Sequence, residues 1–387
     1  MSMLKVLIVF GTRPEAIKMA PLVKELERYP DKIECKVAVT AQHREMLDQV
    51  LELFQINPAH DLNIMQPNQT LYEITSRALV GLKDVLDREN PDIVLVHGDT
   101  TTTFVAGLAA FYRQIKVGHV EAGLRTGNKL SPFPEEMNRK LTGVISDIHF
   151  APTNTAKLNL LREGVDHNNI LITGNTVIDA LLTTVQDEFC FNDDILDNID
   201  YKTKRVLVVT THRRENLGQP LRNVYKALRS VVQKYEDVEL VFPVHKNPKV
   251  RQTVASVLGD LPKVHLIDPL DYSPFVNLMN KAYFVLTDSG GLQEEAPSLG
   301  KPVLVLRDTT ERPEAIDAGT VQLVGTEEDD VFNACQALLE DSSRYRKMAN
   351  SINPYGDGKA SARIREGLEY YFGLKSIRPK EFKVIGS

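Results

Sequence analysis

Three carboxylates stand where a parallel sheet would present them to a ligand. Asp99 and Glu121 each follow an apolar run, IVLVH and KVGHV, and Glu135 lies at a predicted helix start in SPFPEEMNR. Carboxylates in such positions serve as general acids and bases. Structural roles are the alternative, because Asp99 is also placed to cap a helix, and acidic residues in a first turn complement the helix dipole. Neighbouring Glu135 and Glu136 point to different sides of a helix, so we expect only one to face a ligand, and Glu135 is spaced to pair with Arg139.

A second set of residues is suited to bind an anion. Arg13 lies in the turn GTRPE, which opens a predicted helix containing Lys18. His212 and Arg213 follow the run VLVVT, and His245 ends the run VFPV. Positive side chains near a helix N-terminus suit a phosphate group. A solvated loop is the alternative for His212 and its neighbour.

The loop TDSGGLQEEA favours a diphosphate. Ser289, Gly290 and Gly291 precede a predicted helix, where successive backbone N–H groups form a nest for an anion. Glu295, one turn later, is placed to accept hydrogen bonds from a ribose, and Arg312 adds a cation after another apolar run. Together these loops predict a phosphorylated, nucleotide-bound ligand that lies between two domains.

Other ligand signatures are missing from the sequence. It contains no GxGxxG fingerprint, no Walker A motif and no Asp-x-Asp pair. Cys35, Cys190 and Cys335 are far apart, which predicts neither a disulfide framework nor a zinc site. His212 and Glu215 lack a third metal ligand at a suitable spacing. We therefore expect no metal and no cofactor.

The elements that must position these residues are βα units. Short apolar runs alternate with helix-length amphipathic stretches, which predicts parallel strands buried on both faces. Ligands of such sheets bind at the carboxyl ends of the strands. The runs are Leu4–Phe10, Ile33–Thr40, Ile93–His97, Lys116–Val120 and Asp147–Phe150 in the first half, and Arg205–Thr210, Val238–Val244, Val264–Ile267, Tyr283–Thr287, Pro302–Leu306 and Val321–Val324 in the second.

The predicted fold class is α/β, with two doubly wound Rossmann-like domains and a central cleft. At about 150 residues per domain, a chain of 387 residues predicts two to three domains. We expect residues 1–180 to carry the carboxylates and residues 181–360 to carry the phosphate loops, with the acidic segment Gln186–Lys204 as a linker. Residues 361–387 comprise a predicted helix, Ser361–Phe372, and a polar, basic tail.

Composition excludes several classes of partner. Lys and Arg number 46 against 52 Asp and Glu, and the net charge of −6 argues against nucleic acid or an anionic membrane. Trp is absent, which excludes a Trp-based carbohydrate platform. No apolar run approaches the roughly 20 residues of a membrane helix. The first residues lack the pattern of a secretory leader, so we expect a cytoplasmic protein.

Seven motifs occur in the order typical of one enzyme family. They are FGTRPEAIKMAPL, VHGDTTT, GHVEAGLRT, SPFPEEMNR, THRRENLG, LTDSGGLQEEAPSLG and VLVLRDTTERPEA, and the similarity runs from Gly11 to about Gly358. The chain thereby resembles the non-hydrolysing UDP-N-acetylglucosamine 2-epimerases. The resemblance implies a fold similar to the two-domain glycosyltransferase type B, with UDP held mainly by the second domain. It also implies a homodimer and a C-terminal helix that returns to the first domain.

The resemblance also implies roles for individual residues. It assigns catalysis to Asp99, Glu121, Glu135 and His212, and it assigns substrate or UDP binding to Arg13, Lys18, Phe275, Ser289, Gly290, Gly291, Glu295 and Arg312. A second UDP-N-acetylglucosamine (UDP-GlcNAc), acting as an activator, would contact Gln42, His43, Arg213 and His245. Glu45 and Asn68 stand where some regulated relatives have Gln and Arg, so whether activation is retained stays open.

The implied activity interconverts UDP-GlcNAc and UDP-N-acetylmannosamine (UDP-ManNAc) without a redox cofactor. The hydrogen on C2 is too weakly acidic for a base to remove it directly at neutral pH. In the family reaction the C1–O bond to UDP breaks, H2 becomes removable, and a proton returns to the other face of a bound 2-acetamidoglucal. Inversion needs groups on both faces, hence more than one carboxylate, and which is base or acid stays open. The product would supply ManNAc units for cell-surface polysaccharide.

Three alternatives share part of this pattern. A hydrolysing epimerase has the same motifs but releases free ManNAc and UDP. A type B glycosyltransferase has a similar fold but needs an acceptor site and a single base. A non-catalytic nucleotide-sugar sensor would lose the carboxylates, and because all three carboxylates and the histidine are present, the sensor is the least favoured.

Overall fold

The computed structural model describes residues 3–41, 44–66 and 68–384, which form two compact units. The first unit comprises the chain up to Thr183 together with Tyr355–Lys383, and the second comprises Thr184–Pro354. The sequence placed these boundaries at 180/181 and 360/361. The segment Gln186–Lys204, predicted to be a linker, belongs to the second unit. Its backbone is anchored there, since the amide of Gln186 donates to Asn277 Oδ1 at 2.8 Å.

The first unit contains a parallel sheet in the order β3-β2-β1-β4-β5-β6-β7. Its strands are β1 (Leu4–Phe10), β2 (Ile33–Val39), β3 (His60–Asp61), β4 (Ile93–His97), β5 (Lys116–Val120), β6 (Ile148–Ala151) and β7 (Ile170–Ile172). The strands β1, β4 and β5 coincide with the predicted runs. The short strands β3 and β7 were not predicted, because two or three residues give no apolar run that stands out from a loop.

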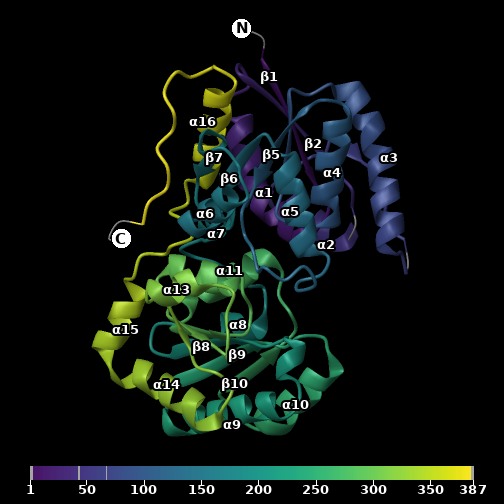
Figure 1. Cartoon of the computed structure of the whole chain (residues 1–387). Helices are drawn as coiled ribbons and strands as arrows, with labels where there is room; N and C mark the ends of the chain where they lie inside the picture. Colours follow the sequence, from purple (N-terminus) through teal and green to yellow (C-terminus); the bar gives the residue numbers. More distant parts are fainter. Residues whose placement is uncertain (1–2, 42–43, 67, 385–387) are drawn as a thin grey trace. The chain divides into compact units, whose positions relative to one another are not determined.

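Helices cover both faces of this sheet. They are α1 (Arg13–Glu27), α2 (Arg44–Leu53), α3 (Leu71–Glu89), α4 (Thr101–Tyr112), α5 (Glu135–Ile145), α6 (Asn154–Arg162), α7 (Thr176–Thr184) and α16 (Ala360–Tyr371). Figure 1 shows α16, in yellow, beside β6 and β7, although it comes from the end of the chain. The contact is close, since a Cβ added to Gly367 would lie 2.9 Å from Leu171 and 3.0 Å from Phe150.

The second unit repeats the design with a parallel sheet in the order β10-β9-β8-β11-β12-β13. Its strands are β8 (Arg205–Thr210), β9 (Val238–Pro243), β10 (Val264–Ile267), β11 (Phe284–Thr287), β12 (Val303–Val305) and β13 (Val321–Leu323). Its helices are α8 (Asp194–Asp197), α9 (Gln219–Lys234), α10 (Pro248–Leu258), α11 (Tyr272–Lys281), α12 (Leu292–Glu295), α13 (Pro313–Asp317), α14 (Glu328–Glu340) and α15 (Ser342–Ala349).

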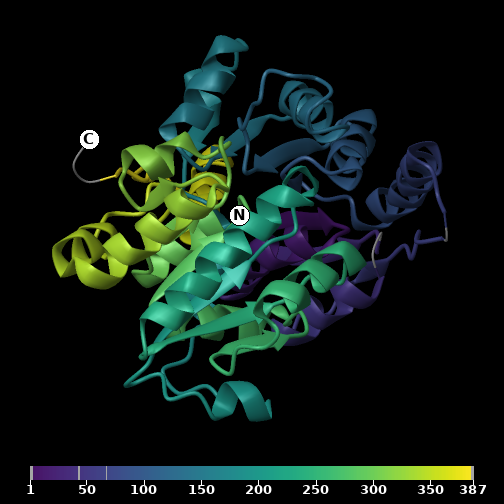
Figure 2. The same cartoon turned by 90° about the horizontal axis from the view of Figure 1, so that it is seen from below.

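A single apolar layer holds one face of the second sheet to its helices. Apolar side chains of α9, α10 and α14 pack with those of β8, β9 and β11 in one buried cluster. Figure 2 shows α9 and α10 running along this sheet. The two parallel sheets with covering helices confirm the predicted fold class.

Each sheet has one point at which successive strands begin to be added on the opposite side. In the first sheet β1 lies beside β4, and in the second β8 lies beside β11. Ligands of doubly wound sheets bind at the carboxyl ends of the strands at such a switch point. The loops that follow these four strands are therefore expected to bind a ligand. They are residues 11–15 and 98–103 in the first unit, and residues 211–216 and 288–291 in the second.

Candidate active site

Glu121 is held by two basic side chains at the end of β5. Lys18 Nζ, from α1, lies 2.5 Å from Glu121 Oε2, and His97 Nε2, at the end of β4, lies 2.9 Å from the same oxygen. Glu121 has φ 61°, a left-handed backbone that is uncommon for a residue with a side chain. Strain of this kind persists where the surroundings fix it, and it occurs often at functional sites. The backbone turn aims the carboxylate back towards α1 and β4.

The environment of Glu121 keeps its carboxylate ionised. Burial raises the pKa of this carboxyl, but the charges of Lys18 and His97 and their hydrogen bonds hold the pKa well below its usual range. The side chain is only 8% exposed. A buried carboxylate that stays ionised is available to accept a proton.

Asp99 is bound to the helix that carries Glu135. Arg139 Nη2 donates to Asp99 Oδ2, and Asn138 Nδ2 donates to the Asp99 carbonyl oxygen at 3.0 Å. The predicted pairing of Glu135 with Arg139 is therefore wrong, because Arg139 turns to Asp99 and also lies 3.5 Å from buried Glu136. The structural alternative for Asp99 is wrong too. The cap of α4 is Thr100, whose hydroxyl accepts from the Thr103 amide.

Glu135 and Glu136 have different surroundings, as expected for neighbours on a helix. Glu136 is fully buried and accepts the amides of Thr126 and Gly127 at 3.1 and 3.0 Å, which fixes the loop before α5. Glu135 is half-buried at the first position of α5. Because Glu135 and Arg139 are four residues apart, they share a helix face, and Arg139 reaches Asp99 from it.

Glu15 joins the two loops at the switch point of the first sheet. Its Oε2 accepts the amides of Gly11 and Thr12 at 3.1 and 2.8 Å. Its Oε1 accepts the hydroxyls of Thr100 and Thr103 at 2.6 and 3.0 Å. This buried carboxylate fixes the turn that carries half-buried Arg13 relative to the loop that carries Asp99.

In the second unit, Asp288 anchors His212. Asp288 follows β11 and is fully buried, and it accepts the amides of His212 and Arg213, both at 2.9 Å. His212 Nδ1 lies 3.0 Å from Asp288 Oδ1, and the imidazole is 42% exposed. The ring of His245 stacks on the ring of His212, with centroids 6.1 Å apart and 28° between the planes.

The predicted phosphate loop lies next to an acidic side chain. A Cβ added to Gly290 would lie 2.7 Å from Glu311 Oε1, so the Glu311 side chain would have to move to make room for it. Glu311 is bound by Arg213 Nη2 at 2.9 Å and by Arg307 Nη1 at 2.5 Å. Burial opposes ionisation, but a backbone hydrogen bond and the two guanidinium groups lower the pKa of Glu311 to about 2. The loop around Ser289 thus lies beside Arg213 and the carboxylate of Glu311, and Arg307 binds that carboxylate.

The remaining predicted substrate residues of the second unit lie on or beside short helices. Arg312 Nε donates to the buried carboxylate of Glu294 on α12. Glu295 is buried at the end of α12. The burial of Tyr272 and the charge of Glu295 raise the pKa of the Tyr272 hydroxyl well above its usual range. Phe275 is half-buried on α11.

The residues predicted for an activator are only partly visible. Gln42 and His43 lie outside the described residues. Arg213 and His245 both lie next to His212, as given above. Glu45 is in the first turn of α2, and Asn68 has a left-handed backbone with φ 56° in the loop before α3.

Three residues of the site were not predicted from the sequence. His97 and Asp288 are located in the predicted loops, but the residues next to them in the sequence do not indicate which side chains they contact. The spacing of Thr12 and Glu15 is that of a capping box, and the structure contains this box. That spacing identifies Glu15 as a helix-start residue, but the two threonine hydroxyls that it also binds come from a loop 85 and 88 residues away.

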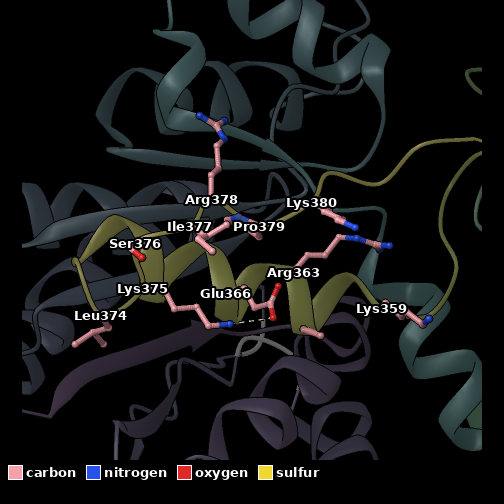
Figure 3. Close-up of a pocket in the computed structure, with 11 residues that line it drawn as sticks. Lys359, Arg363, Glu366, Leu374, Lys375, Ser376, Ile377, Arg378, Pro379 and Lys380 are labelled. Atoms are coloured by element: carbon pink, nitrogen blue, oxygen red, sulfur yellow. Dashed lines mark hydrogen bonds and ion pairs between the residues drawn. The ribbon is translucent and has the colours of Figure 1, made fainter.

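A cavity of about 770 Å³ lies elsewhere, between α16 and the segment that follows it (Figure 3). Three of the basic side chains that line it have partners. Arg363 is bound to Asp357 at 2.7 Å, Lys375 to Glu366 at 3.1 Å, and Arg378 donates to the carbonyl oxygen of Ile170 at 2.5 Å. This cavity contains none of the predicted site residues.

Two features are absent from the part of the chain that the structure describes. No group of three His, Cys, Asp or Glu side chains in it is arranged to hold a metal ion. No helix there is both long and apolar enough to span a membrane.

Known proteins resemble this chain over almost its whole length. The profile of the family described as UDP-N-acetylglucosamine 2-epimerase matches residues 24–369. The UDP-N-acetylglucosamine 2-epimerase of Bacillus subtilis is 58% identical over 382 residues, which cover 99% of both chains.

Solved structures agree with the sequence comparison. The UDP-GlcNAc 2-epimerase of Neisseria meningitidis, bound to UDP-GlcNAc, is 53% identical with a TM-score of 0.83, over 94% of this chain and 99% of that one. The S. aureus protein MnaA, in a co-structure with UDP, is 51% identical with a TM-score of 0.88, over 98% of this chain and 100% of that one. The chain belongs to the UDP-N-acetylglucosamine 2-epimerase family.

Proposed function

We propose that the protein converts UDP-GlcNAc to UDP-ManNAc reversibly, by eliminating UDP to a bound 2-acetamidoglucal and adding it back. The observation that carries the proposal is the gathering of carboxylates at one edge of the first sheet. Asp99 and Glu121 follow the adjacent strands β4 and β5, and Glu135 starts the helix whose Arg139 binds Asp99. The relatives bound to UDP-GlcNAc and to UDP support the ligand.

The carboxylates of the first unit move the proton at C2. Inversion at a carbon requires that one group removes the proton from one face and another returns a proton to the opposite face. Glu121 is ionised, and Asp99 and Glu135 come from different elements, so the unit supplies more than one candidate for each face. Lys18 and His97 keep Glu121 ionised, and Arg139 holds the Asp99 side chain in place.

The second unit binds UDP and stabilises the negative charge that develops on it. His212, as imidazolium, and the loop Ser289–Gly291 stabilise the departing diphosphate. Glu295 accepts from the ribose hydroxyls, with Phe275 and Arg312 as further substrate contacts of this unit, and Arg13 is a substrate contact from the first unit. The resulting glycal stays bound beside UDP, and no redox cofactor takes part.

The proposal includes a homodimer and regulation. Apolar side chains on three neighbouring helices are more than half exposed, which is consistent with a second copy of the chain covering them. They are Tyr72 and Val80 on α3, Phe111 and Tyr112 on α4, and Val144 on α5. A second UDP-GlcNAc acts as activator through Gln42, His43, Arg213 and His245, in a chain where Glu45 and Asn68 replace the Gln and Arg of some regulated relatives. The product supplies ManNAc for cell-surface polysaccharide made from cytoplasmic precursors.

Separation of the reaction products tests the subtype. The purified protein is incubated with UDP-GlcNAc, and anion-exchange chromatography resolves nucleotide sugars from UDP. We expect a mixture of UDP-GlcNAc and UDP-ManNAc at equilibrium, with little free UDP. Free ManNAc together with equal UDP would instead show a hydrolysing epimerase. Glu121→Gln is the inactive variant, and its retained binding of UDP would show that the second unit is intact.

A further inference from the structure

The side chain of Asp288 has more donors around it than a helix-start or turn residue needs. Oδ2 accepts the amides of His212 and Arg213, both at 2.9 Å, and Asn216 Nδ2 at 3.3 Å. Oδ1 lies 3.1 Å from the amide of His212 and 3.0 Å from its Nδ1. The carboxylate thus binds both the backbone and the ring of one residue.

The ionisation of Asp288 determines which ring nitrogen of His212 carries a proton. Burial raises the pKa of Asp288, but the hydrogen bonds from His212 and Arg213 keep this pKa below its usual range. An ionised carboxylate only accepts hydrogen bonds. His212 Nδ1 must therefore be the protonated nitrogen, and Nε2 is the nitrogen that remains for a ligand on the 42% exposed side chain.

The other charged or titratable groups around His212 do not take this role. His245 stacks on the ring, and its own Nδ1 accepts the Asn247 amide at 3.1 Å. The guanidinium of Arg213 is directed to the Asp288 carbonyl oxygen at 3.2 Å and to Glu311 at 2.9 Å. Asp288 is the carboxylate that contacts the His212 imidazole.

We propose that Asp288 is the positioning residue of His212: by accepting the Nδ1–H it fixes the ring orientation and leaves Nε2 to take up the second proton, so that Nε2–H of the imidazolium faces the diphosphate of the leaving UDP. The inference rests on the proposed function. Second groups that orient a catalytic histidine act through tautomer and charge, so they affect the rate more than the fold.

Asp288→Asn tests the inference because it keeps the shape and removes the charge. Asn Oδ1 can still accept the amides of His212 and Arg213, but its Nδ2 would then face Nδ1 and favour the opposite tautomer. We expect kcat to fall about 100-fold with KM changed less than about threefold, and the alkaline limb of the kcat profile to move to lower pH. A loss of kcat below threefold with an unchanged pH profile would overturn the proposal.

Asp179→Asn is the matched control. Asp179 is also a buried aspartate that accepts two backbone amides, those of Ala360 at 3.1 Å and Ser361 at 2.8 Å, but it faces no histidine ring. We expect this variant to lose stability while its pH profile stays that of the wild type. Equal kinetic effects in both variants would show that Asp288 has a merely structural role.

A measurement on the wild type decides the matter even where a variant fails to fold. The ¹⁵N chemical shifts of His212, assigned by comparison with His212→Gln, report the tautomer at a pH where the ring is neutral. Protonated Nδ1 is expected, and protonated Nε2 with free Nδ1 would overturn the proposal. This result does not depend on epimerase activity, so it is separate from failure of the proposed function, which the wild-type product assay reports.

Discussion

Lys18 and Glu121 are 103 residues apart in the sequence, yet Lys18 Nζ lies 2.5 Å from Glu121 Oε2. The ammonium comes from the first turns of α1 and the carboxylate from the end of β5. The contact links the helix that follows β1 with the end of β5, two places along the sheet from β1 and across β4. It gives a buried carboxylate a fixed counter-ion, and His97 contributes from the strand between them.

Removing the ammonium should change the pH at which the enzyme loses activity in acid. In Lys18→Met the pKa of Glu121 rises, because burial still favours the neutral acid and the main opposing charge is gone. Glu121 then becomes protonated at a higher pH, so the acid limb of the kcat/KM profile moves upwards by about one unit or more. Lys24→Met, an exposed lysine on the same helix paired with Glu27, is the control. Identical acid limbs in wild type and Lys18→Met would rule out this role for Lys18.

Glu15 is expected to support both stability and catalysis. Glu15→Gln keeps the size but turns an acceptor-only group into one that donates, which leaves some of the amides and hydroxyls around it without an acceptor. We expect the free energy of unfolding to fall by about 1–3 kcal/mol, and kcat to fall as the loops of Arg13 and Asp99 loosen. Chemical denaturation and steady-state kinetics measure the two effects. Glu27→Gln, at the exposed end of the same helix, should change neither; a Glu15→Gln protein with wild-type stability would contradict the structure.

The buried histidine of β5 makes stability depend on pH. Burial lowers the pKa of His119 to about 3, from its ordinary value near 6.5. Below about pH 6.5 this histidine therefore binds a proton in the unfolded chain but not in the folded one. It lowers the free energy of unfolding progressively as pH falls from 6.5 towards 3, by about 1 kcal/mol per pH unit.

His119→Gln removes this titration and retains a donor near the Gly98 carbonyl oxygen, which lies 2.7 Å from His119 Nε2. The slope of unfolding free energy between pH 6.5 and 5 should become shallower than in the wild type. His167→Gln is the control, since that side chain is 71% exposed. Parallel slopes for wild type and His119→Gln would show that the ring takes up its proton in the folded state.

The C-terminal helix is joined to the first unit by a buried ionic cluster. Arg365 on α16 binds Glu25 on α1 at 2.8 Å and fully buried Glu369 at 2.9 Å. Arg365→Met would leave two carboxylates short of a counter-ion, although Lys375 lies 3.3 Å from Glu369. We expect a loss of about 3 kcal/mol in the unfolding of the first unit.

Arg28→Met is the control for this change. Arg28 lies 3.3 Å from the same Glu25, but its side chain is 73% exposed, and exposed pairs contribute about 0–1 kcal/mol. Hydrogen exchange of α16 locates the effect. Unchanged protection of α16 in Arg365→Met would mean that the cluster does not fasten this helix.

The sequence was sufficient to predict the parallel sheets, because strands buried on both faces are nearly continuous apolar runs. It was also sufficient to find the loops at the strand ends, where Asp99, Glu121 and His212 lie. It was not sufficient for contacts that join distant loops. The spacing of Glu135 and Arg139 allowed them to pair on one helix face, but Arg139 binds Asp99 instead. A spacing rule for isolated helices cannot include a partner that follows a strand.

The buried carboxylates show the same limit in another form. Glu15 and Asp288 lie in motifs that were recognised, but both accept donors from distant segments. Glu15 binds the loop of Thr100 and Thr103, and Asp288 binds the segment from His212 to Asn216. Such a role depends on which strands are neighbours in the sheet, and only the observed order, with β1 beside β4 and β8 beside β11, reveals it.

The most direct test of the proposed reaction follows hydrogen at C2. UDP-GlcNAc is incubated with the protein in D₂O without any added cofactor, and proton NMR follows the sugar signals. Elimination and re-addition predict UDP-ManNAc that carries deuterium at C2, with deuterium also entering the remaining UDP-GlcNAc. UDP-ManNAc that retains its original hydrogen at C2, or an unchanged spectrum from folded protein that binds UDP, would contradict the proposed reaction.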